Sequence, residues 1–212
     1  MVEATTLTAV KKALDERPKR NFVETVELAI NLKDIDLTVP ANRIDEEVQL
    51  PHGRGKPMKI GVFASGELAV RSKGVADVVI PPEEIEKIAG DKTRAKQLAR
   101  QTDFFVSEAP LMPTIGRRLG VVLGPRGKMP KPIPPNSDPR SIVEALRTTV
   151  RVRSRDKRTF HAAVGSTTMS AEQIAENIDA VVKRLSAKLA RGRMNIQSIY
   201  VKTTMGKAER LL

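Results

Sequence analysis

The feature that most constrains the fold is a change of rhythm that occurs twice along the chain. Residues 57–149 alternate short apolar strands with helices, a pattern that predicts a parallel sheet covered by helices on both faces. The outer segments, residues 1–56 and 150–212, are each shorter than about 65 residues and would form thin cores alone. The economical solution is that the two ends fold together and that the middle is inserted between them.

Periodicity places the individual elements. Apolar and polar residues alternate toward Leu32, which predicts a strand, and Ser170 with Gln173 forms a capping-box pattern at the start of a long helix. Acidic residues behind the prolines at 81 and 82 mark another helix start. Helices are expected at residues 3–17, 66–72, 81 onward, 111–119, 141–149 and 170–189. Strands are expected at residues 22–32, 48–50, 59–64, 76–80, 103–106, 121–123, 151–158, 159–164 and 196–202.

The chain is strongly basic, and its excess charge is uneven. The 212 residues hold 37 Lys and Arg against 25 Asp and Glu, for a formal net charge of +12. Residues 150–212 alone hold thirteen basic and five acidic side chains. A hydrophobic content of 40% belongs to a globular protein rather than to a basic disordered tail. This balance favours an anionic partner.

Composition disfavours several classes of site. The chain has no cysteine, which removes thiolate nucleophiles and cysteine metal ligands, and two histidines are too few for a histidine metal cluster. His161 lacks a paired nucleophile. We therefore expect no catalytic residue, no metal and no cofactor. No apolar run reaches the roughly 20 residues of a membrane span, and the first residues lack a signal-peptide pattern, so we expect no membrane association and a cytoplasmic location.

Residues 123–132, Leu-Gly-Pro-Arg-Gly-Lys-Met-Pro-Lys-Pro, are dense in glycine and proline. Prolines remove backbone donors and glycines favour unusual dihedral angles, so this segment is not expected inside a helix. It carries Arg126, Lys128 and Lys131, and no Asp or Glu occurs from position 109 to 137. An ordered positive loop on a basic protein is typical of a surface that faces phosphate.

The phosphate-binding fingerprints of nucleotide enzymes are absent. Gly127-Lys128 is followed by Met129, which breaks the Walker pattern, and only Gly66 follows the strand at 59–64, so a dinucleotide fingerprint is missing too. An α/β enzyme or binding protein for a phosphorylated metabolite stays open as an alternative. A DNA-binding regulator is a further alternative, but no helix-turn-helix pattern is found.

A more specific pattern lies near the C-terminus. Residues 203–207, Thr-Thr-Met-Gly-Lys, end a strand in a basic region. Hydroxyls can bond to phosphate or ribose, and glycine lets a backbone approach closely. Aromatic residues make up only 3% of the chain, and for Phe22 a core position is favoured over base stacking on general grounds. The pattern indicates recognition of a structured RNA through its shape, backbone and 2′-hydroxyls.

Five motifs occur in order along the chain. They are Phe22-x-Glu24-Thr25-Val26-Glu27, Leu50-Pro51-His52-Gly53-x-Gly55-Lys56, Leu123-Gly124-Pro125-Arg126-Gly127-Lys128-Met129-Pro130, Val164-Gly165 and Thr203-Thr204-Met205-Gly206. Together they resemble the ribosomal protein L1 family, the protein of the mobile stalk on the large ribosomal subunit, in its archaeal type. The resemblance covers nearly the whole chain, and the combination is far more specific than any one motif.

The resemblance implies a fold of two domains. Domain I, residues 1–56 and 150–212, is expected to be a discontinuous α+β domain in which an antiparallel sheet packs with helices. Domain II, residues 57–149, is expected to be an inserted Rossmann-like three-layer α/β domain without a nucleotide. A hinge is expected near residues 56–57 and 149–150, where the chain crosses between the domains.

The resemblance also implies a function without catalysis. The protein is expected to bind large-subunit rRNA at the mobile stalk, to assist release of deacylated tRNA from the exit site, and to repress translation of its own mRNA, whose leader mimics the rRNA site. It is expected to be a monomer when free.

The RNA contacts of the family, carried over by position, fall on two stretches of this chain. Basic residues just before the first strand are expected to meet phosphates. The basic loop with Arg126, Lys128 and Lys131 is assigned a supporting rRNA role. The expected contacts are Lys19, Arg20, Phe22, Thr25 and Glu27 in the first stretch, and Ser198, Thr204, Met205 and Gly206 in the second.

Overall fold

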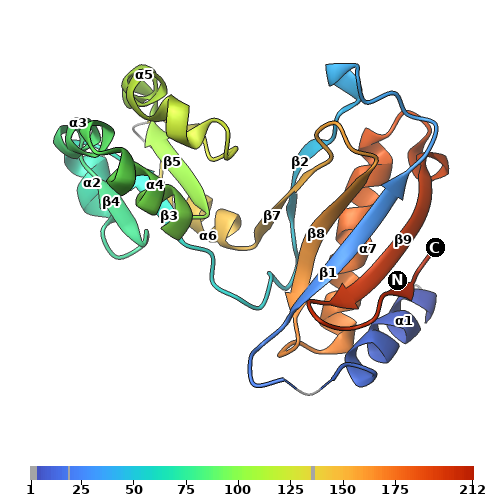
Figure 1. Cartoon of the computed structure of the whole chain (residues 1–212). Coiled ribbons are helices and arrows are strands. Elements are labelled where there is room, and N and C mark those ends of the chain that lie inside the picture. Colours follow the sequence, from blue (N-terminus) through green and yellow to red (C-terminus); the bar gives the residue numbers. More distant parts are fainter. Residues whose placement is uncertain (1–3, 19, 135–136) are drawn as a thin grey trace. The chain divides into compact units, whose positions relative to one another are not determined.

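The computed structural model describes residues 4–18, 20–134 and 137–212, and the chain divides into two compact units (Figure 1). Unit 1 joins Met1–Lys56 to Thr148–Leu212, and unit 2 is Pro57–Arg147. From the sequence we expected the chain to return from unit 2 to unit 1 two residues later, because residues 141–149 were assigned to one helix. That helix ends at Arg147, and Thr149 already opens a strand.

Unit 1 is built on a four-stranded antiparallel sheet in the order β10-β9-β1-β8. The central strand β1 has buried and half-buried residues in strict alternation, as its sequence pattern predicts. Its buried side chains point to the face on which two helices pack. The strands are β1 (Thr25–Leu32), β8 (Thr159–Ser166), β9 (Ile196–Thr203) and β10 (Glu209–Arg210).

The helices of unit 1 are α1 (Ala4–Asp15) and α7 (Ala171–Lys188). Ser170 caps α7 in the predicted capping box: the Gln173 N–H donates to its Oγ, and its own N–H donates to the Gln173 side chain. A second, two-stranded antiparallel sheet of β2 (Asp45–Gln49) and β7 (Thr149–Arg153) contributes to the same apolar core. The short 3-10 helices η1 (Pro40–Asn42) and η3 (Gly192–Asn195) lie in the connections.

Unit 2 is a three-layer α/β fold, which agrees with the expected Rossmann-like class. Its four strands are parallel, in the order β4-β3-β5-β6, and an apolar cluster lies on each face of the sheet. Helices α3, α4 and α5 cover one face, and α2 and α6 cover the other. The strands are β3 (Ile60–Phe63), β4 (Val78–Ile80), β5 (Phe104–Glu108) and β6 (Lys131–Ile133). The helices are α2 (Gly66–Ser72), α3 (Pro82–Gly90), α4 (Lys92–Gln101), α5 (Met112–Leu123) and α6 (Pro139–Arg147), with the 3-10 helix η2 (Ala109–Leu111) before α5.

Two expectations for the elements were wrong, and the helix start expected at 81 was confirmed. The strand expected at 121–123 is the last turn of α5, since the buried residues Ile115, Leu119 and Leu123 recur every four positions. The fourth parallel strand is β6, which lies inside the proline-rich loop and tolerates proline because it is an edge strand. The helix begun at 81 ends at Gly90, and a separate helix follows because the Asp91 carboxylate accepts the N–H groups of Thr93 and Arg94.

Candidate nucleic-acid interface

The turn after β9 is held against the start of β1. The Gly206 N–H donates to the Thr203 carbonyl at 3.2 Å, which closes the turn. The Thr204 Oγ1 accepts from the Thr25 N–H and lies 3.2 Å from the Thr25 carbonyl oxygen, to which it donates. Two ends of the chain that lie 179 residues apart in sequence therefore share one small rigid structure.

Glu24 fixes the middle of this turn, although sequence reasoning did not single it out as a site residue. Its side chain is buried, and its Oε1 accepts the Met205 N–H at 2.9 Å. Thr167 also holds the Glu24 backbone: the Glu24 N–H donates to the Thr167 Oγ1, and the Thr167 N–H donates to the Glu24 carbonyl. A buried carboxylate that accepts a backbone N–H makes a stronger bond than a neutral acceptor. The signal was present in the Phe22-x-Glu24-Thr25 motif, but an acid before a strand is usually solvated.

Glycine is required at position 206. A Cβ built there would lie 2.4 Å from the Oγ1 of Thr203, whose side chain is fully buried. Real Cβ atoms essentially never come that close, so a side chain at 206 forces either Thr203 or the turn to shift. The Thr-Met-Gly pattern is therefore a backbone shape as well as a set of functional groups.

Exposed apolar side chains lie beside the same strand end. Phe22 is 55% exposed and Met205 is 56% exposed, and Val23 is exposed as well. The core position favoured for Phe22 on general grounds is therefore wrong. Arg20 is exposed just before Phe22, and Lys19 lies outside the described residues. Exposed apolar side chains grouped at one strand end are a feature of contact surfaces.

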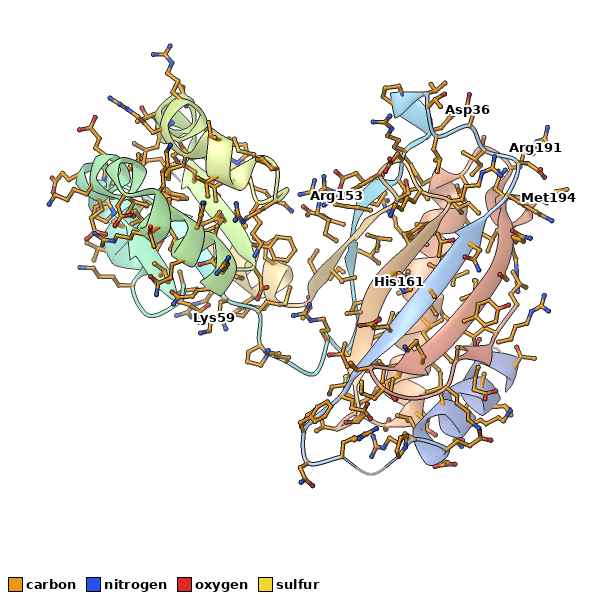
Figure 2. The ribbon with its side chains drawn as sticks, viewed as in Figure 1. Asp36, Lys59, Arg153, His161, Arg191 and Met194 are labelled. Atoms are coloured by element: carbon orange, nitrogen blue, oxygen red, sulfur yellow. The ribbon has the colours of Figure 1, made fainter. Side chains whose placement is uncertain are left out.

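One face of the unit 1 sheet carries mostly polar residues in register and lies opposite α1 and α7. Figure 1 shows α7 behind the sheet, and Figure 2 shows His161 on β8. Three rows cross this face, which we call the open face. The rows are Lys202–Glu27–Ala163, Tyr200–Ala29–His161 and Ser198–Asn31–Thr159.

Ser198 lies at the far end of the open face from the Thr204 turn. It pairs with Asn31, six residues along β1 from Thr25, which is roughly 20 Å at the strand rise per residue. Its Oγ accepts from the Asn31 Nδ2 at 2.8 Å, and Thr159 donates to the Asn31 Oδ1 at 2.7 Å. Ser198 is only 8% exposed. The structure therefore brings Thr25, Thr204, Met205 and Gly206 together and leaves Ser198 apart from them.

Part of the basic charge of unit 1 is paired within the fold. Arg151 donates two hydrogen bonds to Asp45, and Arg184 donates two to Glu46. The bound guanidinium lowers the pKa of each carboxyl below its usual value, with burial opposing the shift. The strand positions of Arg151 and its neighbour Arg153 thus face a carboxylate. Exposed cations lie farther along, in the β7–β8 connection, at Arg155, Lys157 and Arg158.

The basic loop of unit 2 differs from its first interpretation. The Lys128 ammonium donates to the carbonyls of Ala99 and Thr102 at 2.9 and 2.6 Å, at the C-terminus of α4, and burial lowers its pKa. Arg126 donates to the Val122 carbonyl of α5. Cations at helix C-termini satisfy free carbonyls and complement the helix dipole. Lys131 is half-buried in β6. The geometry favours a structural role for Lys128 and Arg126 over a phosphate site.

Unit 2 has its own carboxylate where a nucleotide phosphate binds in related sheets. Open parallel sheets bind ligands outside the strand ends at the point where the strand order reverses, here between β3 and β5. At that point the Ser65 N–H and Oγ donate to the Glu108 Oε2 at 3.0 and 2.6 Å. Among residues 4–18, 20–134 and 137–212, no group of three or more acidic or histidine side chains is placed to hold a metal. In the same ranges, none of the helices has the length and apolar character needed to cross a membrane.

Comparisons with known proteins cover nearly the whole chain. The model of the ribosomal protein L1p/L10e family matches residues 10–207. A protein of Methanocella arvoryzae named large ribosomal subunit protein uL1 is 56% identical over 213 aligned positions that span both chains completely. Proteins of the same name from Archaeoglobus fulgidus and Haloferax volcanii are each 54% identical, over 96% and 95% of this chain and 95% of their own. The similarity therefore runs through both units.

Proposed function

The chain belongs to the ribosomal protein L1p/L10e family, and from that premise we propose that it binds the mobile stalk of large-subunit rRNA through unit 1. Membership confirms the resemblance carried by the five motifs. It makes the chain a structural protein of the large ribosomal subunit, in the cytoplasm, and not an enzyme.

The single observation that carries the proposed RNA site is the Thr204–Gly206 turn. Its backbone is fixed by Glu24 and Thr25, while the side chains of Met205 and Phe22 stay exposed beside it. A rigid polar and apolar surface that loses little entropy on binding suits a folded partner. A structured RNA fits this surface because hydroxyl and backbone groups can read ribose and phosphate, and one ring or thioether can cover a sugar or base.

In the proposed mechanism the RNA lies along the open face. The turn contacts it at one end, with Thr25 and Glu27 on the adjoining strand, and Ser198 marks the other end. Glu27 accepts from RNA hydroxyls or base amino groups, which requires a fixed geometry because a carboxylate otherwise repels phosphate. Lys19, Arg20 and Lys202 neutralise phosphates, so affinity falls as salt rises.

Two further roles rest on the same surface. We include repression of the protein's own mRNA, because a leader that mimics the stalk RNA would occupy the same site. We also include assistance in release of deacylated tRNA from the exit site, with unit 2 moving about a hinge at the two crossings. The free protein is proposed to be a monomer.

The site can be tested by changing the turn. Thr204→Val with Met205→Ala removes one hydroxyl and one exposed thioether, and it should weaken binding to a stalk rRNA transcript at least tenfold, while circular dichroism stays that of the parent. A matched control is Thr5→Val with Met194→Ala, which makes the same two changes at other exposed positions of unit 1. Equal affinity of the folded Thr204–Met205 variant and the parent removes the turn from the site.

A phosphorylated-metabolite protein is the second reading, favoured by the three-layer α/β fold of unit 2 alone. The Glu108 carboxylate already accepts the Ser65 donors at the strand ends, and Lys128 already binds two carbonyls. Neither position therefore offers a free donor for the phosphate of a metabolite. Titration of the protein with stalk rRNA, its DNA copy and nucleotides at several salt concentrations separates the readings. Tight nucleotide binding with no preference for RNA favours the metabolite protein.

A further inference from the structure

The chain leaves unit 1 and returns to it along one paired edge. Strands β2 and β7 end as neighbours, with Gln49 opposite Thr149. One step farther, the Leu50 N–H donates to the Thr148 carbonyl at 3.0 Å. Backbone pairing therefore holds both crossings to unit 1 as far as Leu50 and Thr148.

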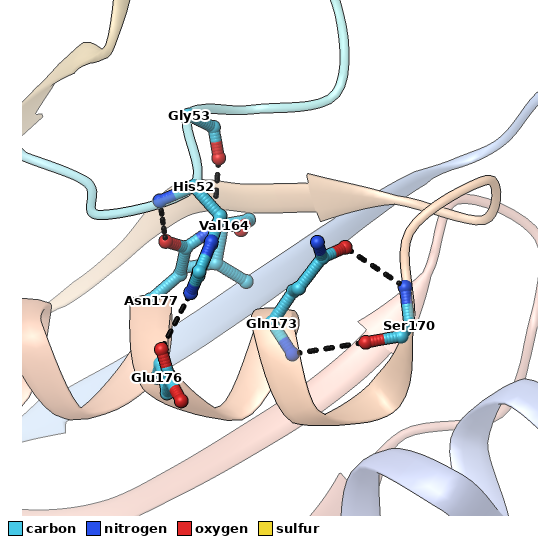
Figure 3. A network of polar contacts seen from close by, with 7 residues as sticks. All are labelled: His52, Gly53, Val164, Ser170, Gln173, Glu176 and Asn177. Carbon is cyan, nitrogen blue, oxygen red and sulfur yellow. Dashed lines mark hydrogen bonds and ion pairs between the residues drawn. The ribbon is translucent and has the colours of Figure 1, made fainter.

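A buried amide holds the first crossing for several residues more. Asn177 of α7 is 0% exposed, and its Oδ1 accepts the His52 N–H at 3.1 Å (Figure 3). Its Nδ2 donates to the Gly53 carbonyl at 2.7 Å and to the Val164 carbonyl at 2.8 Å. Both amide protons are thus used, and one side chain ties the crossing segment to α7 and β8 together.

Two contacts farther out extend this hold. The His52 ring contacts the Glu176 carboxylate, next to Asn177 on α7 (Figure 3). Gly55 has a φ of +70°, and a Cβ built there would lie 2.3 Å from the Ser166 Oγ at the end of β8. The segment from His52 to Gly55 therefore lies against unit 1 in a conformation that suits glycine.

On the outgoing side, the hydrogen bonds of unit 2 begin a few residues after Gly55. The Lys59 N–H donates to the Asp103 Oδ2 at 3.1 Å, and Met58 is buried. At the return crossing, Arg147 donates to the Val75 carbonyl at 2.9 Å. Between the residues held by each unit lie only Lys56–Pro57 on the way out and the bond from Arg147 to Thr148 on the way back.

We propose that Asn177 is a positioning residue, a latch that confines motion between the units to these two short pivots. The inference rests on the proposed function only in that unit 2 is to move relative to an RNA-bound unit 1. Releasing the latch removes the hydrogen bonds that tie residues 52 and 53 to α7 and β8, so the outgoing pivot is no longer confined to Lys56–Pro57. A longer free segment permits a wider range of orientations.

The test uses the full-length protein and an Asn177→Asp variant, which keeps the size of the side chain and replaces both donors by an acceptor. The carboxylate leaves the Gly53 and Val164 carbonyls without their donors and repels them, although it can still accept the His52 N–H. We therefore expect the segment to open more often and hydrogen exchange at the His52 amide to become about tenfold faster or more. The matched control is Asn195→Asp. Asn195 is a buried amide of unit 1 that also donates to two carbonyls, those of Lys33 and Asp34, away from the crossing.

A second readout reports the pivot itself. Because the chain has no cysteine, Val70→Cys and Thr5→Cys place one spin label in each unit at exposed positions. We expect the distance distribution to broaden in the Asn177→Asp protein and to stay that of the parent in the Asn195→Asp protein. If Asn177 only stabilised unit 1, the two variants should affect the label distances alike, because each removes the donors of one buried amide of unit 1.

Gly55→Ala covers the case in which Asn177→Asp does not fold. This exposed glycine lies within the crossing segment, and an added methyl group must lift residue 55 from Ser166, so the distribution should broaden. The latch is overturned if the Asn177→Asp protein folds and both its hydrogen exchange and its label distances are unchanged. If that protein does not fold, unchanged label distances in the Gly55→Ala protein overturn the latch. RNA affinity, measured in parallel on the parent, tests the proposed function separately.

Discussion

Replacement of Glu24 by alanine gives a prediction whose sign opposes simple electrostatics. Removing one negative charge from a protein of net charge +12 should by itself strengthen binding to RNA. Yet Glu24 is buried and accepts the Met205 N–H at 2.9 Å, so its loss leaves the centre of the turn without its anchor. A hydrogen bond to a charged group contributes about 1.5–3 kcal/mol. If RNA binding must restore the turn, that range corresponds to a loss of affinity of roughly 10- to 150-fold.

The assay is fluorescence anisotropy of a labelled stalk rRNA transcript at one fixed salt concentration. Glu172→Ala is the control, because it removes the same charge from an exposed position at the start of α7. We expect Glu172→Ala to bind as tightly as the parent or more tightly, and Glu24→Ala to bind much more weakly. Circular dichroism and the melting temperature establish that both variants are folded. A folded Glu24→Ala protein that binds as tightly as Glu172→Ala refutes the reasoning.

Three further outcomes are expected. Lys128→Met should lower the melting temperature of unit 2, because two carbonyls at the end of α4 lose a charged donor worth about 1–3 kcal/mol. The same change should alter RNA affinity less than twofold. A large loss of RNA affinity at unchanged stability would restore the phosphate-binding role of Lys128. Lys202→Met should reduce the slope of log affinity against log salt by up to about 0.9, with calorimetry as the check on folding; an unchanged slope places Lys202 away from the phosphates. The pKa of Asp45 is lowered by Arg151 in the folded state, so its contribution to stability is present above the ordinary value of 3.8 and is lost as the pH falls through the lower folded value. In the Asp45→Asn protein, the free energy of unfolding measured by chemical denaturation should therefore depend less on pH in this acid range. An unchanged pH dependence contradicts the pairing of Asp45 with Arg151.

Elements with strong local signals could be predicted from sequence. The alternation along β1 and the Ser170 capping box could both be recognised, because each is a pattern that residues within a few positions of one another display. Strand β6 could not be predicted, since three residues in a proline-rich segment become a strand only by pairing with β5. The valines at 121 and 122 resemble a strand locally, but the core contacts of α5 decide for helix.

The candidate site shows the same division. The Thr-Met-Gly pattern was visible as residues, whereas its rigidity depends on Glu24 and Thr25, which lie far away in sequence. Lys128 looked free because its partners, the carbonyls of Ala99 and Thr102, are backbone groups that no composition reveals. Charge counting treats every lysine alike, and only the fold separates those that are already bound from those that face solvent.

Hydrogen exchange of the full chain, with and without a stalk rRNA transcript at low salt, tests the central claim most directly. We expect RNA to protect backbone amides around residues 22–27 and 203–206, two segments from opposite ends of the chain, with lesser protection toward Ser198. Protection confined to unit 2, or protection of only one of the two segments, contradicts a single RNA platform formed by both ends.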